Sequence, residues 1–138
     1  MEKVLGFLGE VVDQQTFLDG TREFMIEARS DAAAEGAGEW LLTLSFRWLA
    51  EIDASVEEGD LSLTGADGAG LYAALIDGAA ELIYDEDSAE DVTLLRLTAA
   101  VRSGEGRYAD WTGSIRVSGR LAGGHARLEA EMDLSSPS

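Results

Sequence analysis

Cysteine is absent from this chain of 138 residues, and histidine and proline occur once each. Without cysteine the chain has neither disulfides nor a thiolate nucleophile, a composition that fits a reducing cytoplasm, where we expect the protein to reside. His125 has no cysteine near it that would complete a metal site, so we predict no metal. His125 could in principle belong to a Ser-His-acid triad, but the sequence has no Gly-x-Ser-x-Gly elbow. The simpler interpretation is that His125 is an ordinary polar residue of a hairpin.

Basic residues are also scarce, with 10 lysines and arginines against 27 acidic residues and a formal net charge of −17. Because such a field repels phosphate, we predict that the chain binds neither nucleic acid nor an anionic membrane surface. The acidic residues are scattered along the chain. This distribution indicates a solvated acidic surface rather than a metal-buffering role. No apolar run approaches the length of a membrane span. The hydrophobic share of 46% and the length predict one folded domain over residues 1–138.

What the sequence does contain is a repeated alternation of apolar and polar residues, the pattern of half-buried strands. Phe24, Ile26 and Ala28 alternate with polar neighbours. A second run places five large apolar residues on one face, namely Trp40, Leu42, Leu44, Phe46 and Trp48. Further strands are predicted from Leu61, over 71–84, over 92–102, and in a final hairpin of 113–121 and 126–134 around Ala122-Gly123-Gly124.

Turn signals separate these runs at 31–38, at Glu57-Glu58-Gly59-Asp60, at 66–70 and at 85–91. The lone proline, Pro137, interrupts none of the predicted ladders, and residues 135–138 are expected to fray. At the other end, apolar residues recur at helical spacing (Val4, Leu5, Leu8, Val11 and Val12), so residues 1–18 are interpreted as a short helix, an irregular first strand or a lid over a barrel mouth.

Seven or eight strands at regular spacing, with glycines inside several of them, predict an all-β fold. Glycines 78, 113 and 119 suit the sharp curvature of a small closed barrel. We therefore predict an antiparallel closed β-barrel of about eight strands with a short N-terminal helical or lid segment.

The stretch from Ser103 to Gly119 contains a glycine pair, Gly104 and Gly106, followed by Arg107 and Tyr108. A glycine-rich phosphate loop requires a helix after it. Here an alternating strand follows over 114–118, so the glycines are interpreted as a tight turn or bulge that feeds a barrel strand.

The same stretch, with Gly106-Arg107-Tyr108 and then Thr112-Gly113, resembles a motif of the allene oxide cyclase and dirigent-type β-barrels. Within them it is nearest to the bacterial spirotetronate cyclases, which are intramolecular Diels–Alder enzymes. The close match covers this segment alone. The resemblance implies a natural-product cyclase that folds a flexible polyene or polyketide into a reactive conformer without a cofactor, where orientation supplies much of the rate enhancement.

Aromatic and arginine side chains are the candidates for such a site. Hydrogen-bond donors for catalysis are Tyr72, Tyr84 and Arg96, the last with Glu81 as its expected partner if it points inward. Substrate-binding walls are predicted from the remaining aromatic residues, Trp40, Phe46, Trp48, Tyr108 and Trp111, against the simpler alternative that these are core.

Two other function classes stay open. A lipocalin-like carrier would use the same cavity without catalysis, and an interaction module would have a filled barrel and an exposed patch. Alternation with a period of two residues does not show which face of a strand points into the barrel. The sequence therefore does not choose between the cyclase, the carrier and the interaction module. Leu41 and Leu49, opposite the aromatic face, indicate a homodimer.

Overall fold

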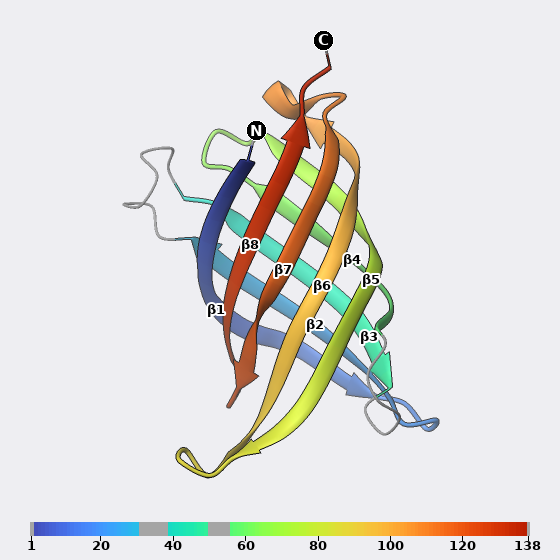
Figure 1. Cartoon of the computed structure of the whole chain (residues 1–138), viewed down its shortest axis with the longest axis vertical. Helices are drawn as coiled ribbons and strands as arrows, with labels where there is room; N and C mark the ends of the chain where they lie inside the picture. The colour runs from blue at the N-terminus through green and yellow to red at the C-terminus, as the bar shows by residue number, and fades with distance from the viewer. Residues whose placement is uncertain (1, 31–38, 50–55, 138) are drawn as a thin grey trace.

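A computed structural model describes residues 2–30, 39–49 and 56–137, apart from the side chains of Leu49 and Glu57. Its strands form a closed antiparallel barrel in which each pairs with the next along the chain and the last pairs with the first (Figure 1). The predicted fold class is confirmed. The strands are β1 (Glu2–Thr16), β2 (Thr21–Ser30), β3 (Leu41–Leu49), β4 (Val56–Thr64), β5 (Gly70–Asp85), β6 (Glu90–Glu105), β7 (Thr112–Ala122) and β8 (His125–Ser135), with a 3-10 turn, η1 (Gly106–Tyr108), between β6 and β7. The turn expected at 31–38 lies outside the described residues.

The interpretation of the N-terminus as a helix or lid is wrong, because β1 is a strand that pairs with β2 on one side and β8 on the other. The physical reason is that a spacing of four residues fits both periods. Val4, Leu8 and Val12 recur every four residues, as one face of a helix would, and in β1 all three lie exposed on the outer face of the barrel. A bulge between Val11 and Asp13 further blurs the strand period.

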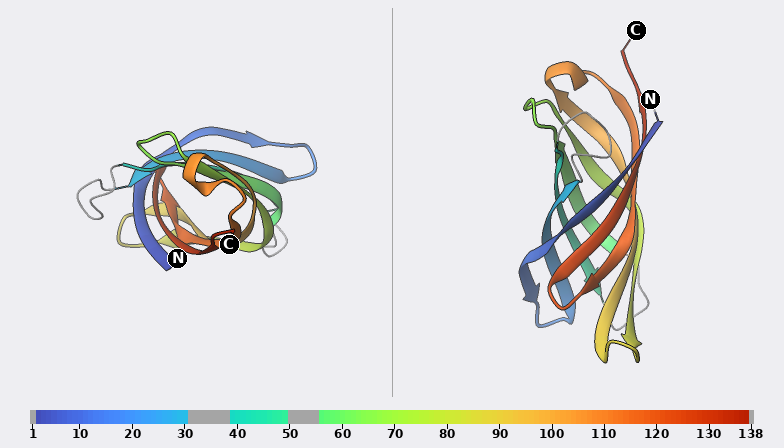
Figure 2. Two further views of the ribbon diagram at one scale, coloured as in Figure 1. Left: turned by 90° about the horizontal axis from the view of Figure 1, so that it is seen from above. Right: turned by 90° about the vertical axis from the view of Figure 1, so that its left-hand side faces the viewer.

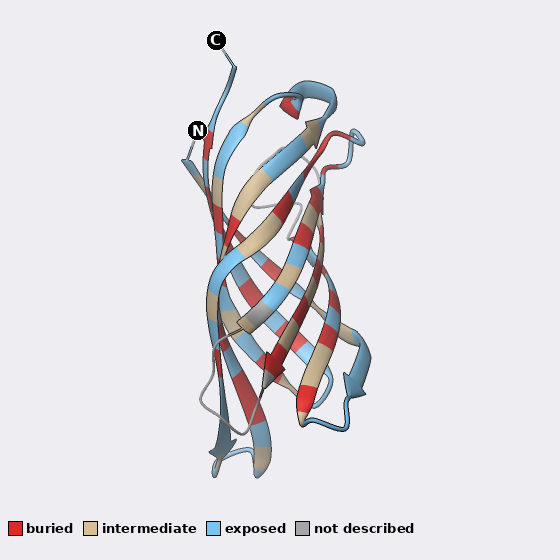
Figure 3. Ribbon diagram, turned by 90° about the vertical axis from the view of Figure 1, so that its right-hand side faces the viewer, coloured by how far each residue is buried: buried red, intermediate tan, exposed pale blue. Residues whose placement is uncertain are grey.

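The core fills the inside of the barrel, because the inward-facing residues of all eight strands join one hydrophobic cluster. The five apolar residues predicted to share one face, which are Trp40 just before β3 and four residues within it, all point inward and are each no more than 1% exposed. The apolar face predicted for β2 is buried with them. Buried and exposed residues alternate along the strands (Figure 3). Side chains this inaccessible to a water-sized probe touch protein on every side, so the described interior is packed rather than open.

The turn predicted at Glu57-Glu58-Gly59-Asp60 is wrong, since these residues continue β4. Gly59 pairs with Phe46, and a Cβ there would lie 2.4 Å from the carbonyl oxygen of Ser45. Glycine is needed here for the close approach of two strands rather than for a turn. The final hairpin is confirmed, with Gly123 and Gly124 at φ 58° and 81°, the left-handed pair that a two-residue turn requires. Ser135 still belongs to β8, so the prediction that residues 135–138 fray is wrong for Ser135.

A long hairpin extends beyond the rest of the barrel, where β5 and β6 run downward together in Figure 1 and in the right-hand view of Figure 2. The register of β4 with β5 covers Asp60–Thr64 and Gly70–Ala74, and from Leu75 onward β5 pairs with β6 alone. The turn predicted at 85–91 forms the tip of this hairpin. The hairpin brings Asp85 near the outer face of β7, which matters for the site described below.

Two glycines of β1 provide a matched test of this packing. A Cβ on Gly9 would lie 2.0 Å from the carbonyl oxygen of Glu27, whereas nothing lies within 4 Å of a Cβ on Gly6. We therefore expect Gly9→Ala to lower the free energy of unfolding by about 1–3 kcal/mol, the usual cost of overpacking. Gly6→Ala should change it by less than about 0.5 kcal/mol, as surface substitutions do. Urea unfolding of both variants measures this, and equal midpoints would contradict the strand pairing at Gly9.

Candidate functional site

The predicted substrate-binding aromatics belong to the core. Trp40, Phe46, Trp48 and Tyr108 are buried in the central cluster, and Trp111 packs half-buried against it. The predicted donors lie elsewhere, because Tyr72, Tyr84 and Arg96 are exposed.

The buried aromatics form two groups, one near each end of β3. In the first group, Trp40 lies 5.7 Å from Tyr108 and Tyr108 lies 5.3 Å from Trp111, measured between ring centroids. In the second group, Phe24 stacks on Phe46 at 5.5 Å and lies 6.3 Å from Trp48. The motif loop therefore serves packing at one end of the barrel, since η1 brings Tyr108 onto Trp40.

Each aromatic group contains one unpartnered donor. The Nε1 atoms of Trp40 and Trp48 are buried, and neither finds a hydrogen-bond acceptor among the residues that the structure describes. Buried polar groups are almost always paired with protein or ordered water, so these two indoles are the polar features of the interior that call for a partner.

The three predicted donors are not brought together. The Tyr72 hydroxyl lies 3.4 Å from a carboxylate oxygen of Asp60, a long hydrogen bond on the outer surface. Tyr84 stands near the end of β5, opposite Asp91. Arg96 lies opposite Ser118 on β7, and Glu81 lies opposite Leu94 rather than opposite Arg96. Their catalytic roles stay predictions.

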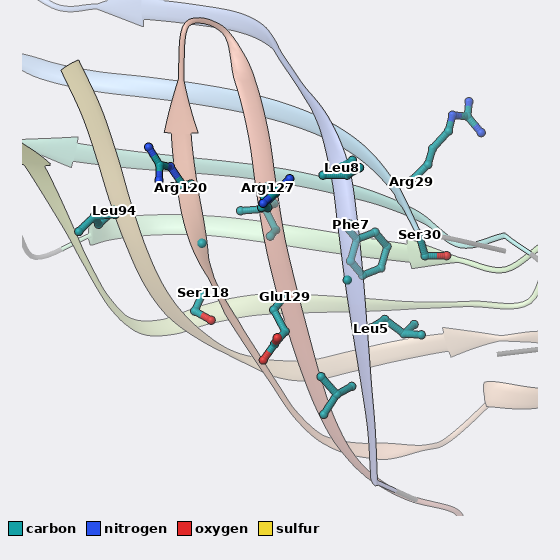
Figure 4. Close-up of a pocket in the computed structure, with 14 residues that line it drawn as sticks. Leu5, Phe7, Leu8, Arg29, Ser30, Leu94, Ser118, Arg120, Arg127 and Glu129 are labelled. Atoms are coloured by element: carbon teal, nitrogen blue, oxygen red, sulfur yellow. The ribbon is translucent and has the colours of Figure 1, made fainter. Parts of the chain in front are cut away.

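A groove on the outer face of the barrel has a volume of about 1060 Å³. It crosses β1, β8, β7 and β6 (Figure 4). Residues of five strands line it: Val4, Leu5, Gly6, Phe7, Leu8, Arg29, Ser30, Leu94, Ser118, Gly119, Arg120, Arg127, Leu128 and Glu129. We call this the outer groove.

Strand register explains how residues distant in the sequence meet there. Leu8 pairs with Arg127, Arg127 with Arg120, and Arg120 with Leu94. These four residues form one row across four strands, on the outward side of each. Figure 4 shows the two arginines side by side, with Leu94 beyond one and Leu8 beyond the other. The row is thus a pair of cations with an apolar side chain at each end.

The hollow beside this row comes from small residues. Two positions along each strand, the next row contains Gly6, Glu129 and Ser118 in register. Gly6 has no side chain, and the space where its Cβ would be is open. Gly6 and Ser118 on either side of Glu129 are short, so this row leaves a depression between rows with longer side chains. Val4 borders the depression on its far side.

The cations of the groove differ in how they are paired. Arg29 bonds Glu39 at 2.6 Å, and an Nη of Arg120 lies 3.6 Å from an Oδ of Asp85, which is a loose ion pair between half-exposed groups. Arg127 is exposed and has no ion-pair partner among the described residues. The groove thus presents one unpaired and one loosely paired guanidinium side by side.

Sequence reasoning missed this site, although one signal for it was present. A two-residue turn at Gly123-Gly124 pairs residues symmetrically about it, which places Arg120 opposite Arg127. Like charges directly opposite on one face destabilise a sheet, so an arginine pair at these positions stands out. Leu8 was not recognisable as its neighbour, because the sequence left open whether residues 1–18 form a helix, an irregular strand or a lid and predicted no register for them.

No group of three or more metal-binding side chains gathers in the ranges that the structure describes. Among the same residues no helix is long and apolar enough to cross a membrane. In comparisons with known proteins, no family model, no curated protein and no solved structure matches this chain. The site is therefore interpreted from its own geometry.

Asp85, beside the groove, titrates below its usual range. The backbone N–H of Asp87 lowers the pKa of this carboxyl most, followed by the Ser88 side chain, with Arg120 a smaller cause. We expect its carboxyl resonance in an NMR titration to have a midpoint below 3.8, the ordinary value. A carboxyl whose pKa is lower in the folded than in the unfolded chain stabilises the fold at any pH above its unfolded pKa. This stabilisation is lost as the pH falls through the lower, folded-state pKa.

The order of causes is testable with two variants. Ser88→Ala should move the midpoint toward 3.8 more than Arg120→Gln does, because the side chain of Ser88 precedes the Arg120 charge among the causes. A midpoint at or above 3.8 in the native protein would contradict the geometry of the hairpin tip.

Proposed function

We propose that this β-barrel binds a small hydrophobic molecule in the outer groove and acts as a carrier or ligand-binding protein. One observation carries the proposal. Leu8 and Val4 are 63% and 51% exposed, and Leu94 is 39% exposed, all on the borders of a single hollow. Exposed apolar side chains scattered over a surface are ordinary, but three of them around a single depression are typical of a binding site.

The dimensions of the groove support a small ligand. Ligand pockets commonly have volumes of about 300–1,000 Å³ and combine apolar walls with a few polar groups. The outer groove is of this size, with aliphatic borders and polar groups supplied by arginines, Ser118 and Glu129. A ligand that covered the three exposed aliphatic side chains would gain about 25 cal/mol for each Å² of apolar surface removed from water.

Cyclisation of a polyene or polyketide-like molecule is a second candidate function. The observation that favours it is the pair of unpartnered indole donors inside the barrel, on Trp40 and Trp48. Because the described interior is packed, a substrate would reach these donors only if core side chains moved aside to admit it. A donor reached in this way would polarise a ligand carbonyl, and confinement would fold the substrate into a reactive conformer. An intramolecular cyclisation forms its bonds from electron pairs already in the substrate, so no atom is gained or lost.

Substitution at Gly6 tests the binding proposal. We expect Gly6→Leu to weaken binding of the neutral fluorescent probe N-phenyl-1-naphthylamine by roughly tenfold, because the added side chain occupies the hollow that is open in the native protein. Gly6→Ala is the matched control and should change the affinity by less than about threefold. Fluorescence titration of the three proteins gives the dissociation constants.

Equal affinity of the Gly6→Leu variant and the native protein would show that the probe binds elsewhere and would overturn the proposed site. The cyclase candidate has its own readout. Incubation with linear polyenes should give a product of unchanged mass and new retention time, and unchanged substrate throughout the panel would remove the support for catalysis.

A further inference from the structure

We propose that the ligand of the outer groove is an amphiphile with a single negative charge, such as a medium-chain carboxylate, and that Arg120 and Arg127 bind its anionic group. This inference rests on the proposed function and names the class of ligand. It is carried by the two guanidinium groups, their position between two leucines, and the charge of the rest of the chain.

The two arginines are cross-strand partners. Arg120 on β7 pairs with Arg127 on β8, on the same outward face and on either side of a tight turn. Directly opposed like charges repel each other and weaken a sheet, so the arrangement is unfavourable until an anion lies between them. An oxyanion offers two oxygens, and guanidinium groups bind planar carboxylates through paired N–H donors.

Both guanidinium groups have donors to spare. Arg127 has no ion-pair partner among the described residues. Arg120 approaches Asp85 only to 3.6 Å and its side chain is 48% exposed. By contrast, Arg116 on the same strand is held by Glu131 at 2.9 Å, which shows that this sheet neutralises an arginine when the register offers it a glutamate. Arg120 and Arg127 instead have each other and two leucines as cross-strand neighbours.

The acidity of the chain makes this position selective. A protein with a net charge of −17 repels anions in general, so an anion that binds must do so at a local cluster of cations. Glu129 lies two residues beyond Arg127 on the same face and lines the groove. A carboxylate so near disfavours a ligand with several charges, such as a phosphate ester, more than one with a single charge.

The row also sets the direction of the ligand. Leu8 borders the arginine pair on one side and Leu94 on the other, and the hollow over Gly6 and Ser118 lies alongside. A carboxylate held at the arginines would lay its hydrocarbon chain along this hollow against Leu8 and Val4. Head group and chain are thus recognised by adjacent rows of one sheet.

Calorimetric titration with decanoate and with decanol separates the proposal that the groove binds an apolar molecule from the proposal that it recognises an anionic group. The two probes have the same chain length, and only decanoate carries a charge. We expect the native protein to bind decanoate about threefold to tenfold more tightly than decanol. This is the range for charge-assisted contacts at a half-exposed site. The preference should shrink as the salt concentration rises, because exposed charges are screened.

Variants assign the preference to the arginines. Arg127→Gln and Arg120→Gln should each weaken decanoate binding by roughly threefold to tenfold and leave decanol binding within about twofold. Arg102→Gln removes the same charge from an exposed position outside the groove and is the matched control. Thermal unfolding of all the variants checks that they fold, and loss of the like-charge contact should leave the melting temperature unchanged or raise it.

The failures are distinguishable. If native protein binds decanol and decanoate equally, the anionic group is not recognised, and this inference is overturned while the binding proposal stands. If neither probe binds, the proposed function fails first. A decanoate preference that Arg102→Gln reduces as much as Arg127→Gln does would reflect net charge alone and would also overturn the assignment.

Discussion

The pairing of the first strand with the last is the interaction on which the rest of the structure depends. Residues 2–10 of β1 run antiparallel to residues 133–125 of β8 without a shift of register. This ladder closes the sheet and so removes its free edges there. It also decides which residues of β1 stand beside the final hairpin. Leu8 meets Arg127 because of this register, and a slip by one residue would turn Leu8 into the core and Phe7 outward.

The filled interior has a consequence for function. Large side chains such as Trp40, Phe46 and Trp48 lie inside a small barrel and are almost inaccessible. In an eight-stranded barrel, side chains can occupy the whole interior or leave room for one small ligand. Here core side chains occupy the interior. The hollow with an apolar border lies on the outer face, where Gly6 and Ser118 have short side chains or none. The same alternation that builds the core thus leaves a second surface free for recognition.

Much of the fold could be predicted from the sequence, because alternation identifies strands that have one buried face. The apolar faces of β2 and β3, the final hairpin and the closed barrel were all predicted on that basis. Errors arose where one pattern fits two causes. A spacing of four residues suits a helix and a strand alike, so a helical or lid segment was predicted where β1 is a strand. Gly59 indicated a turn, although it allows two strands to pack closely.

The site was harder to predict than the fold. Which face of a strand points inward is not readable from period two, so the direction of Arg96 stayed open until the structure placed it outside. The outer groove combines β1, β6, β7 and β8, and only the register of strands distant in the sequence brings Leu8 next to Arg127. Its arginine pair was readable from the hairpin alone, but its apolar borders were not.

The central claim is that ligand binds outside a filled barrel. Intermolecular nuclear Overhauser effects between bound decanoate and the leucine and valine methyl groups test it most directly. Leu8 and Val4 line the outer groove, whereas Leu44 and Leu97 are buried in the core. We predict contacts from the decanoate chain to the methyl groups of Leu8 and Val4. Contacts to the methyl groups of Leu44 and Leu97 would place the ligand inside the barrel and contradict the account.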